Sequence, residues 1–62
     1  MDKDEVIAIL ERMLSDELGA REGCKELERI VGGHDELDRH VAACNRRAAA
    51  LTLAVELVRV HL

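Results

Sequence analysis

The first half of the chain places apolar residues at the spacing of an α-helix. Between Val6 and Val31 they recur every three or four positions, which is the period of one helix face. Asp2 followed by Glu5 forms a capping-box pattern, and the glycine pair at 32–33 is a typical helix end. We therefore predict a helix over about residues 2–31. Its expected contact face, the first seam, carries Val6, Leu10, Met13, Glu17, Ala20, Cys24, Leu27 and Val31.

The second half repeats this pattern after a short interruption. Asp35 is a suitable N-cap, and Glu36 and Asp38 suit the positive first turn of a helix. The spacing predicts a second helix over about residues 35–61. Its contact face, the second seam, carries Leu37, Val41, Cys44, Ala48, Leu51, Val55, Val58 and Leu62.

The two seams match when the chain folds back at its glycine pair. Because the connection is short, the helices should be antiparallel neighbours. Cys24 then lies opposite Cys44, Glu17 lies opposite Leu51, and every other seam residue also meets a seam residue. We therefore expect an all-α, antiparallel two-helix hairpin that forms a single domain over residues 1–62.

Apolar residues outside the seams predict that the hairpin needs a partner. A chain of 62 residues without Pro or aromatic side chains buries a modest core. The second helix carries a further apolar stripe, which would mark an interface. The simplest expectation is a homodimer that forms a four-helix bundle, and a different helical protein is the alternative. The residues expected at this dimer or partner interface are Ile7, Leu14, Leu18, Ala50, Leu53, Leu57 and Val60.

Glu17 is the one charged residue of the seams. A carboxylate in such a position is costly unless it is paired or bound to a metal. One interpretation makes Glu17 a metal ligand or the partner of a basic group in a dimer core. The other makes it an edge residue paired with Arg21 or Arg47.

Two cysteines and one histidine are further candidates for chemistry. Cys24 and Cys44 fall in the same predicted layer, so they are a possible redox pair or two small buried residues. His40 lies one turn before Cys44 and is a candidate metal ligand beside Glu17. There is no CxxC pattern to indicate a zinc site.

The basic residues of the second helix suggest a binding patch. Arg39, Arg46 and Arg47 are its main cluster, and Arg39 and Arg46 continue the further apolar stripe towards the turn. This arrangement suits a protein target or an anionic ligand, whereas the alternative is a solvated face with local ion pairs. Nucleic acid is an unlikely partner because the formal net charge is −4.

Two glycines interrupt the predicted first helix. Gly19 and Gly23 lie one turn apart in its middle. Each costs roughly 1 kcal/mol relative to Ala in a helix interior. We therefore expect another helix or a neighbouring subunit to approach the backbone there.

Segments of both helices resemble a family of known fold. They are Asp16-Glu17-Leu18-Gly19-Ala20-Arg21-Glu22-Gly23, Asn45-Arg46-Arg47-Ala48 and Ala54-Val55-Glu56-Leu57. Together they are similar to one helical hairpin of a ferritin-like, four-helix-bundle family of unknown function. The resemblance implies that Glu17 fills the place of a metal-binding Glu. The Glu-x-x-His of such sites has no counterpart between Cys44 and Ala50.

These observations favour a small non-enzymatic protein that dimerises and regulates or binds another protein. No phosphate-binding loop or catalytic constellation is present in the sequence, so we expect no enzyme activity and no cofactor. A metal-carboxylate or redox protein is the first alternative, and a nucleic-acid-binding dimer is the second. The chain starts without a signal-peptide pattern and has no apolar run that could span a bilayer. We expect a cytoplasmic protein without membrane contact.

Overall fold

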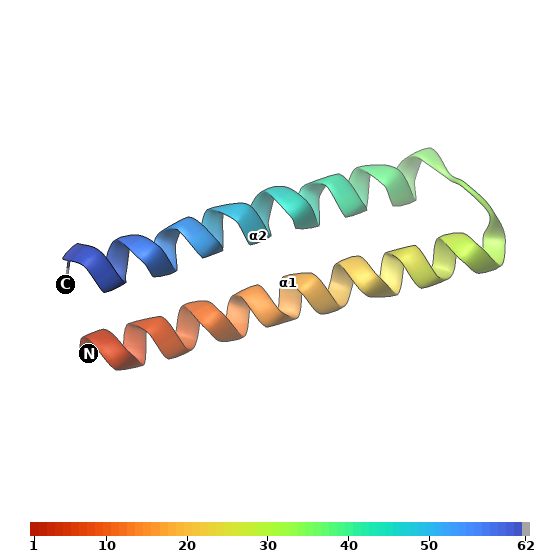
Figure 1. Cartoon of the computed structure of the whole chain (residues 1–62). Helices are drawn as coiled ribbons and strands as arrows, with labels where there is room; N and C mark the ends of the chain where they lie inside the picture. Colours follow the sequence, from red (N-terminus) through yellow and green to blue (C-terminus); the bar gives the residue numbers. More distant parts are fainter. Residues whose placement is uncertain (62) are drawn as a thin grey trace.

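The computed structural model describes residues 1–61 and consists of two long helices. Helix α1 spans Lys3–Val31 and helix α2 spans Asp35–His61. Figure 1 shows α2 running back beside α1, so that both ends of the chain lie at the same end of the molecule. The predicted all-helical class and both helix ranges are confirmed, with no strand among residues 1–61.

Both ends of α1 are capped by the residues that the sequence pattern predicts. The Asp2 side chain caps the helix by accepting a 2.8 Å hydrogen bond from the backbone N–H of Glu5. At the other end, Gly32 adopts a φ of +84° and donates its N–H to the carbonyl of Glu28. A positive φ is strained for residues with a Cβ atom, so the glycine is suited to this position.

The start of α2 differs from the expectation. His34 supplies the cap, because its Nδ1 atom accepts a 3.1 Å hydrogen bond from the backbone N–H of Glu36. Asp35 is the first helical residue and not the cap. Its carboxylate belongs to an acidic first turn, where negative charge suits the helix dipole. The prediction that Asp35 caps this helix was therefore wrong.

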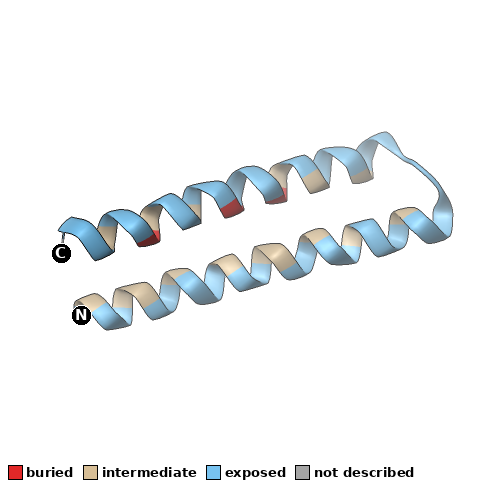
Figure 2. Ribbon diagram, viewed as in Figure 1, coloured by how far each residue is buried: buried red, intermediate tan, exposed pale blue. Residues whose placement is uncertain are grey.

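The face of α2 that packs on α1 follows the second seam. Cys44, Ala48 and Val55 are buried along the middle of this face (Figure 2). The remaining members within residues 1–61 are half-buried: Leu37, Val41, Leu51 and Val58. Leu62, the last member of the predicted seam, lies outside the described residues.

The face of α1 that packs on α2 is rotated relative to the first seam. Leu10, Glu17 and Cys24 are half-buried as expected. Met13 and Leu27 are exposed, and the neighbouring Leu14 and Glu28 are less exposed than they are. Ala20 and Val31 are exposed as well. The prediction was therefore wrong at these four positions: Met13, Ala20, Leu27 and Val31.

Polar contacts between the helices accompany this rotation. The ammonium group of Lys3 donates to the carbonyl of Arg59 over 2.8 Å, and the guanidinium of Arg21 donates to the side-chain oxygen of Asn45 over 3.0 Å. Such long side chains pack their stems against apolar surface while their polar ends reach a partner. An apolar pattern alone cannot identify positions of this kind.

The hairpin is thin and exposes much of its surface. Its principal dimensions are 44 × 14 × 12 Å. Its accessible surface is 4591 Å², whereas a compact monomer of this mass exposes about 4,000 Å². No helix in the described residues is both long enough and apolar enough to span a bilayer.

Candidate functional site

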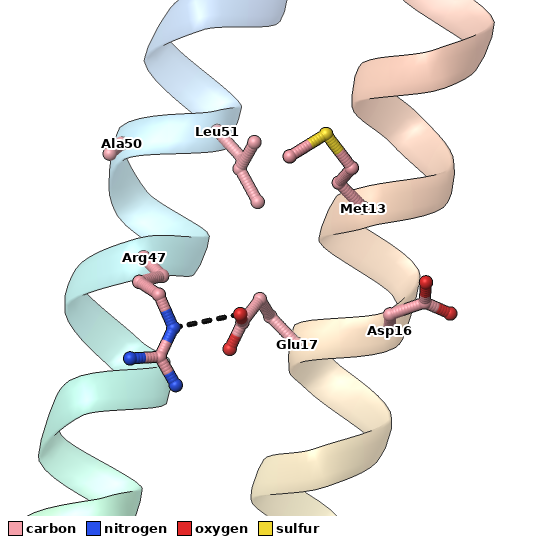
Figure 3. Close-up of a pocket in the computed structure, with 6 residues that line it drawn as sticks. All are labelled: Met13, Asp16, Glu17, Arg47, Ala50 and Leu51. Atoms are coloured by element: carbon pink, nitrogen blue, oxygen red, sulfur yellow. Dashed lines mark hydrogen bonds and ion pairs between the residues drawn. The ribbon is translucent and has the colours of Figure 1, made fainter.

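A groove opens between the two helices near the middle of the hairpin. Its volume is 390 Å³, and six side chains line it (Figure 3). Helix α1 contributes Met13, Asp16 and Glu17, and helix α2 contributes Arg47, Ala50 and Leu51. The groove therefore combines apolar walls with one ion pair and one further carboxylate.

The ion pair joins Glu17 of α1 to Arg47 of α2. The Nε atom of Arg47 donates to Oε1 of Glu17 over 2.7 Å, and Figure 3 shows the two side chains meeting across the space between the helices. The Glu17 side chain is 22% exposed and that of Arg47 is 55% exposed. The geometry is that of a charge-assisted hydrogen bond, which is shorter and stronger than a neutral one.

This contact changes the acidity of both groups. The hydrogen bond from Arg47 is the main cause that lowers the pKa of Glu17, and the positive charge of the guanidinium acts in the same direction. Burial opposes these effects, and the neighbouring Cys44 thiol supports them. The same hydrogen bond and the charge of Glu17 raise the pKa of Arg47. Both side chains are therefore ionised at neutral pH.

The pairing of Glu17 is incomplete. Its second oxygen, Oε2, is shielded from solvent and accepts no hydrogen bond from any group in residues 1–61. A buried carboxylate oxygen without a donor is unfavourable. Arg47 uses a second nitrogen, Nη2, to approach the Cys44 sulfur at 3.7 Å. The site is thus a salt bridge with one unused acceptor.

Of the predicted cysteine and histidine candidates, Cys44 lies beside the Glu17–Arg47 pair. Cys24 and Cys44 are free thiols, the first half-buried and the second buried. His40 is exposed on α2, away from the residues that line the groove. No group of three or more His, Cys, Asp or Glu residues within 1–61 is arranged to hold a metal ion.

The three arginines of the predicted basic patch do not form one cluster. Arg39 and Arg46 are exposed two helical turns apart and share one side of α2. Arg47 lies about 100° further round the helix and is engaged with Glu17 in the groove. Any basic surface on the outer side of α2 therefore consists of Arg39 and Arg46.

The residues expected at an interface are divided between two environments. Those of α2 are exposed, namely Ala50, Leu53, Leu57 and Val60. Those of α1 are half-buried, namely Ile7, Leu14 and Leu18. The large apolar side chains that α1 exposes are Ile9, Met13, Leu27, Ile30 and Val31. The sequence pattern assigned Met13, Leu27 and Val31 to the hairpin seam and did not single out Ile9 or Ile30, because two neighbouring rows of apolar residues run along α1.

Comparisons of the chain with protein-family models, with curated proteins and with solved structures give no match.

Proposed function

We propose that this protein is a small non-enzymatic helical module that works as a homodimer and binds a further protein. The observation that carries the proposal is the apolar surface left uncovered. Leu53 and Val60 of α2 are 56% and 74% exposed, and Met13 of α1 is 48% exposed. Exposed apolar surface of this extent on a small protein favours association.

A second copy is the simplest cover for this surface. In the proposed dimer, two antiparallel hairpins pack together into an assembly of four helices. A standard interface buries about 800 Å² on each partner, which the 4591 Å² of this thin hairpin can supply. Complete burial of a fully exposed apolar side chain contributes about 1.5–3 kcal/mol, and the half-exposed side chains of this hairpin contribute a corresponding part of it. Dimerisation thus compensates for the small core of one chain.

Two separate apolar surfaces support a role beyond dimerisation. Leu53, Leu57 and Val60 are exposed on α2. On α1, Met13 is exposed and lines the groove, and Ile9 is exposed one helical turn before it. An isologous dimer through one surface leaves part of the other for a different protein. In this proposal, the groove side of α1 receives the protein target.

Sedimentation of the purified chain over a wide concentration range tests the dimer. We expect a dimeric mass for the wild type and a monomeric mass for Leu53→Asp, with helical circular dichroism retained in both. Ser15→Asp is the matched control, because Ser15 is an exposed polar residue of α1 and lies outside the exposed apolar surface of α2. A stable wild-type monomer would contradict the proposal.

Photo-crosslinking tests the protein target. A photoreactive amino acid at position 13 should give an adduct of one defined mass with another protein in the cell of origin. The same group at position 45, beside Arg21 on the charged side of the hairpin, should not. Adducts at both positions, or self-adducts alone, would contradict the assignment of a target to α1.

A further inference from the structure

The outer side of α2 carries a stripe of exposed residues with a regular spacing. This outer stripe lies roughly opposite the buried residues Cys44, Ala48 and Val55. Its members are separated by alternating steps of four and three residues, the spacing of a helix-packing seam. All of them are exposed: Ala42, Arg46, Ala49, Leu53, Glu56 and Val60.

We propose that α2 packs antiparallel against α2 of a second copy through the outer stripe, with the twofold axis level with Leu51. This inference rests on the proposed dimer and names its contact surface. Because the outer stripe lies roughly opposite the face that packs on α1, the four helices of this dimer lie side by side in a layer and do not close a bundle. In an antiparallel pair, moving along one helix by a given step moves along the other by the same step in reverse. Positions equally distant from Leu51 therefore face each other.

The apolar layers of this pairing match small residues with large ones. Ala42 faces Val60 of the partner subunit, and Ala49 faces Leu53 of the partner subunit. Each alanine leaves room for the branched side chain opposite it, which favours close packing of the two helices. Because the axis is twofold, each layer occurs twice.

The remaining layer matches opposite charges. Arg46 faces Glu56 of the partner subunit, and the symmetry repeats this pair. Within the described chain, neither residue takes part in an ion pair or a side-chain hydrogen bond. They lie ten residues apart on one helix, about 15 Å, so the two cannot pair with each other in a single chain. A second copy supplies the missing partner for both.

Shifting one α2 helix along the other by seven residues gives a poorer match. It places Glu56 opposite Arg39 of the partner subunit and leaves Val60 without a facing position in the stripe. Arg39 is exposed on the same side of α2 as Arg46. It is therefore the residue that distinguishes the two registers.

Charge exchange tests this interface by sedimentation at a concentration where the wild type is a dimer. Arg46→Glu and Glu56→Arg should each raise the dimer dissociation constant at least about tenfold, because each places like charges opposite one another. An equimolar mixture of the two variants should form heterodimers, since each position then faces an opposite charge. The double variant R46E/E56R should form homodimers again. Arg39→Glu, the matched control, should dimerise like the wild type.

The outcomes separate this inference from the proposed function. A monomeric wild type would contradict the proposed function itself. A dimeric wild type with a dimeric Arg46→Glu variant would overturn only the outer-stripe interface. Dissociation by Arg39→Glu but not by Arg46→Glu would overturn the register, and so would single variants that stay monomeric when mixed. Helical circular dichroism of each variant excludes unfolding as the cause of a monomeric mass.

Discussion

Arg47 and Glu17 connect the two helices near the middle of the hairpin, with the Nε atom of Arg47 donating to Oε1 of Glu17 over 2.7 Å. Oε2 of the same carboxylate accepts no hydrogen bond within residues 1–61. One oxygen of the carboxylate therefore accepts a strong hydrogen bond, and the other accepts none. Removal of either partner has unequal consequences, because only one of them is shielded from water.

The first prediction concerns this pair. Arg47→Ala should lower the midpoint of urea unfolding, because it leaves a shielded carboxylate without its cation. The double variant E17L/R47L should be at least as stable as the wild type, since two apolar side chains replace a partly buried pair beside Leu51 and Met13. Circular dichroism at one protein concentration measures both midpoints.

Arg59→Ala is the control for the loss of a cross-helix ion pair. Arg59 contacts Glu11 at 3.1 Å, but both side chains are more than half exposed. Exposed pairs contribute little to stability, so this variant should unfold near the wild-type midpoint. Equal losses for Arg47→Ala and Arg59→Ala would show that shielding of Glu17 has no energetic role.

The second prediction uses a pair of carboxyl groups near the turn. A hydrogen bond with Asp38 is the main cause that raises the pKa of Glu28, and the negative charge of Asp38 adds to it. In the unfolded chain the ordinary value of 4.5 applies. The favourable contribution of protonated Glu28 is therefore complete below that pH and is lost as the pH rises through the raised value.

Glu28→Gln should remove the loss of stability that accompanies ionisation of Glu28, because glutamine carries no charge. We expect the variant to be more stable than the wild type at neutral pH and the difference to shrink below the ordinary Glu value, as measured by urea unfolding across pH. The pH dependence that comes from Glu17 runs in the opposite direction. The stabilisation by its contact with Arg47 is present above pH 4.5 and is lost as the pH falls through the lowered pKa of Glu17. Glu26→Gln is the control, because Glu26 pairs with Arg29 and should not gain stability. A Glu28→Gln variant that is less stable than the wild type at neutral pH would contradict a repulsion between the Glu28 and Asp38 carboxylates.

The helix boundaries could be predicted because they depend on neighbouring residues. The Asp2 cap and the positive φ of Gly32 are both local features. The contact face of α2 was also predictable, because an apolar residue occupies each of its seam positions. The contact face of α1 was not, because Arg21 and Glu28 take part in it through polar contacts with α2. Polar contacts of this kind can be predicted only when the position of the second helix is known.

The groove could be predicted in part. Glu17 stood out as a carboxylate within an apolar seam, and Arg21 and Arg47 were its possible partners. The structure assigns Arg47, because Arg21 reaches Asn45 instead. The capping role of His34 could not be read from the sequence, because the adjacent Asp35 has the side chain that usually performs it.

The third prediction concerns the glycines. No atom lies within 4 Å of the place where a Cβ atom would stand on Gly19 or Gly23, so α2 does not approach the backbone there. Gly23→Ala should therefore raise the free energy of unfolding by about 0.5–1 kcal/mol. Gly32→Ala should lower it by about 1–2 kcal/mol, because its φ of +84° disfavours a Cβ atom. Urea unfolding measures both. A loss of stability in Gly23→Ala would indicate that a second chain packs against this part of α1.

The last prediction separates the two thiols. Cys44 is 3% exposed, whereas Cys24 is half-buried. Alkylation followed by mass spectrometry should therefore modify Cys24 first, and Cys44 should react only when the helices separate. Val55→Ala weakens the same buried face and should accelerate modification of Cys44 without changing the rate at Cys24. Without reductant, the intact mass should correspond to two free thiols. A mass lower by two hydrogen atoms, or equal reaction rates at the two cysteines, would contradict this assignment and favour the redox pair.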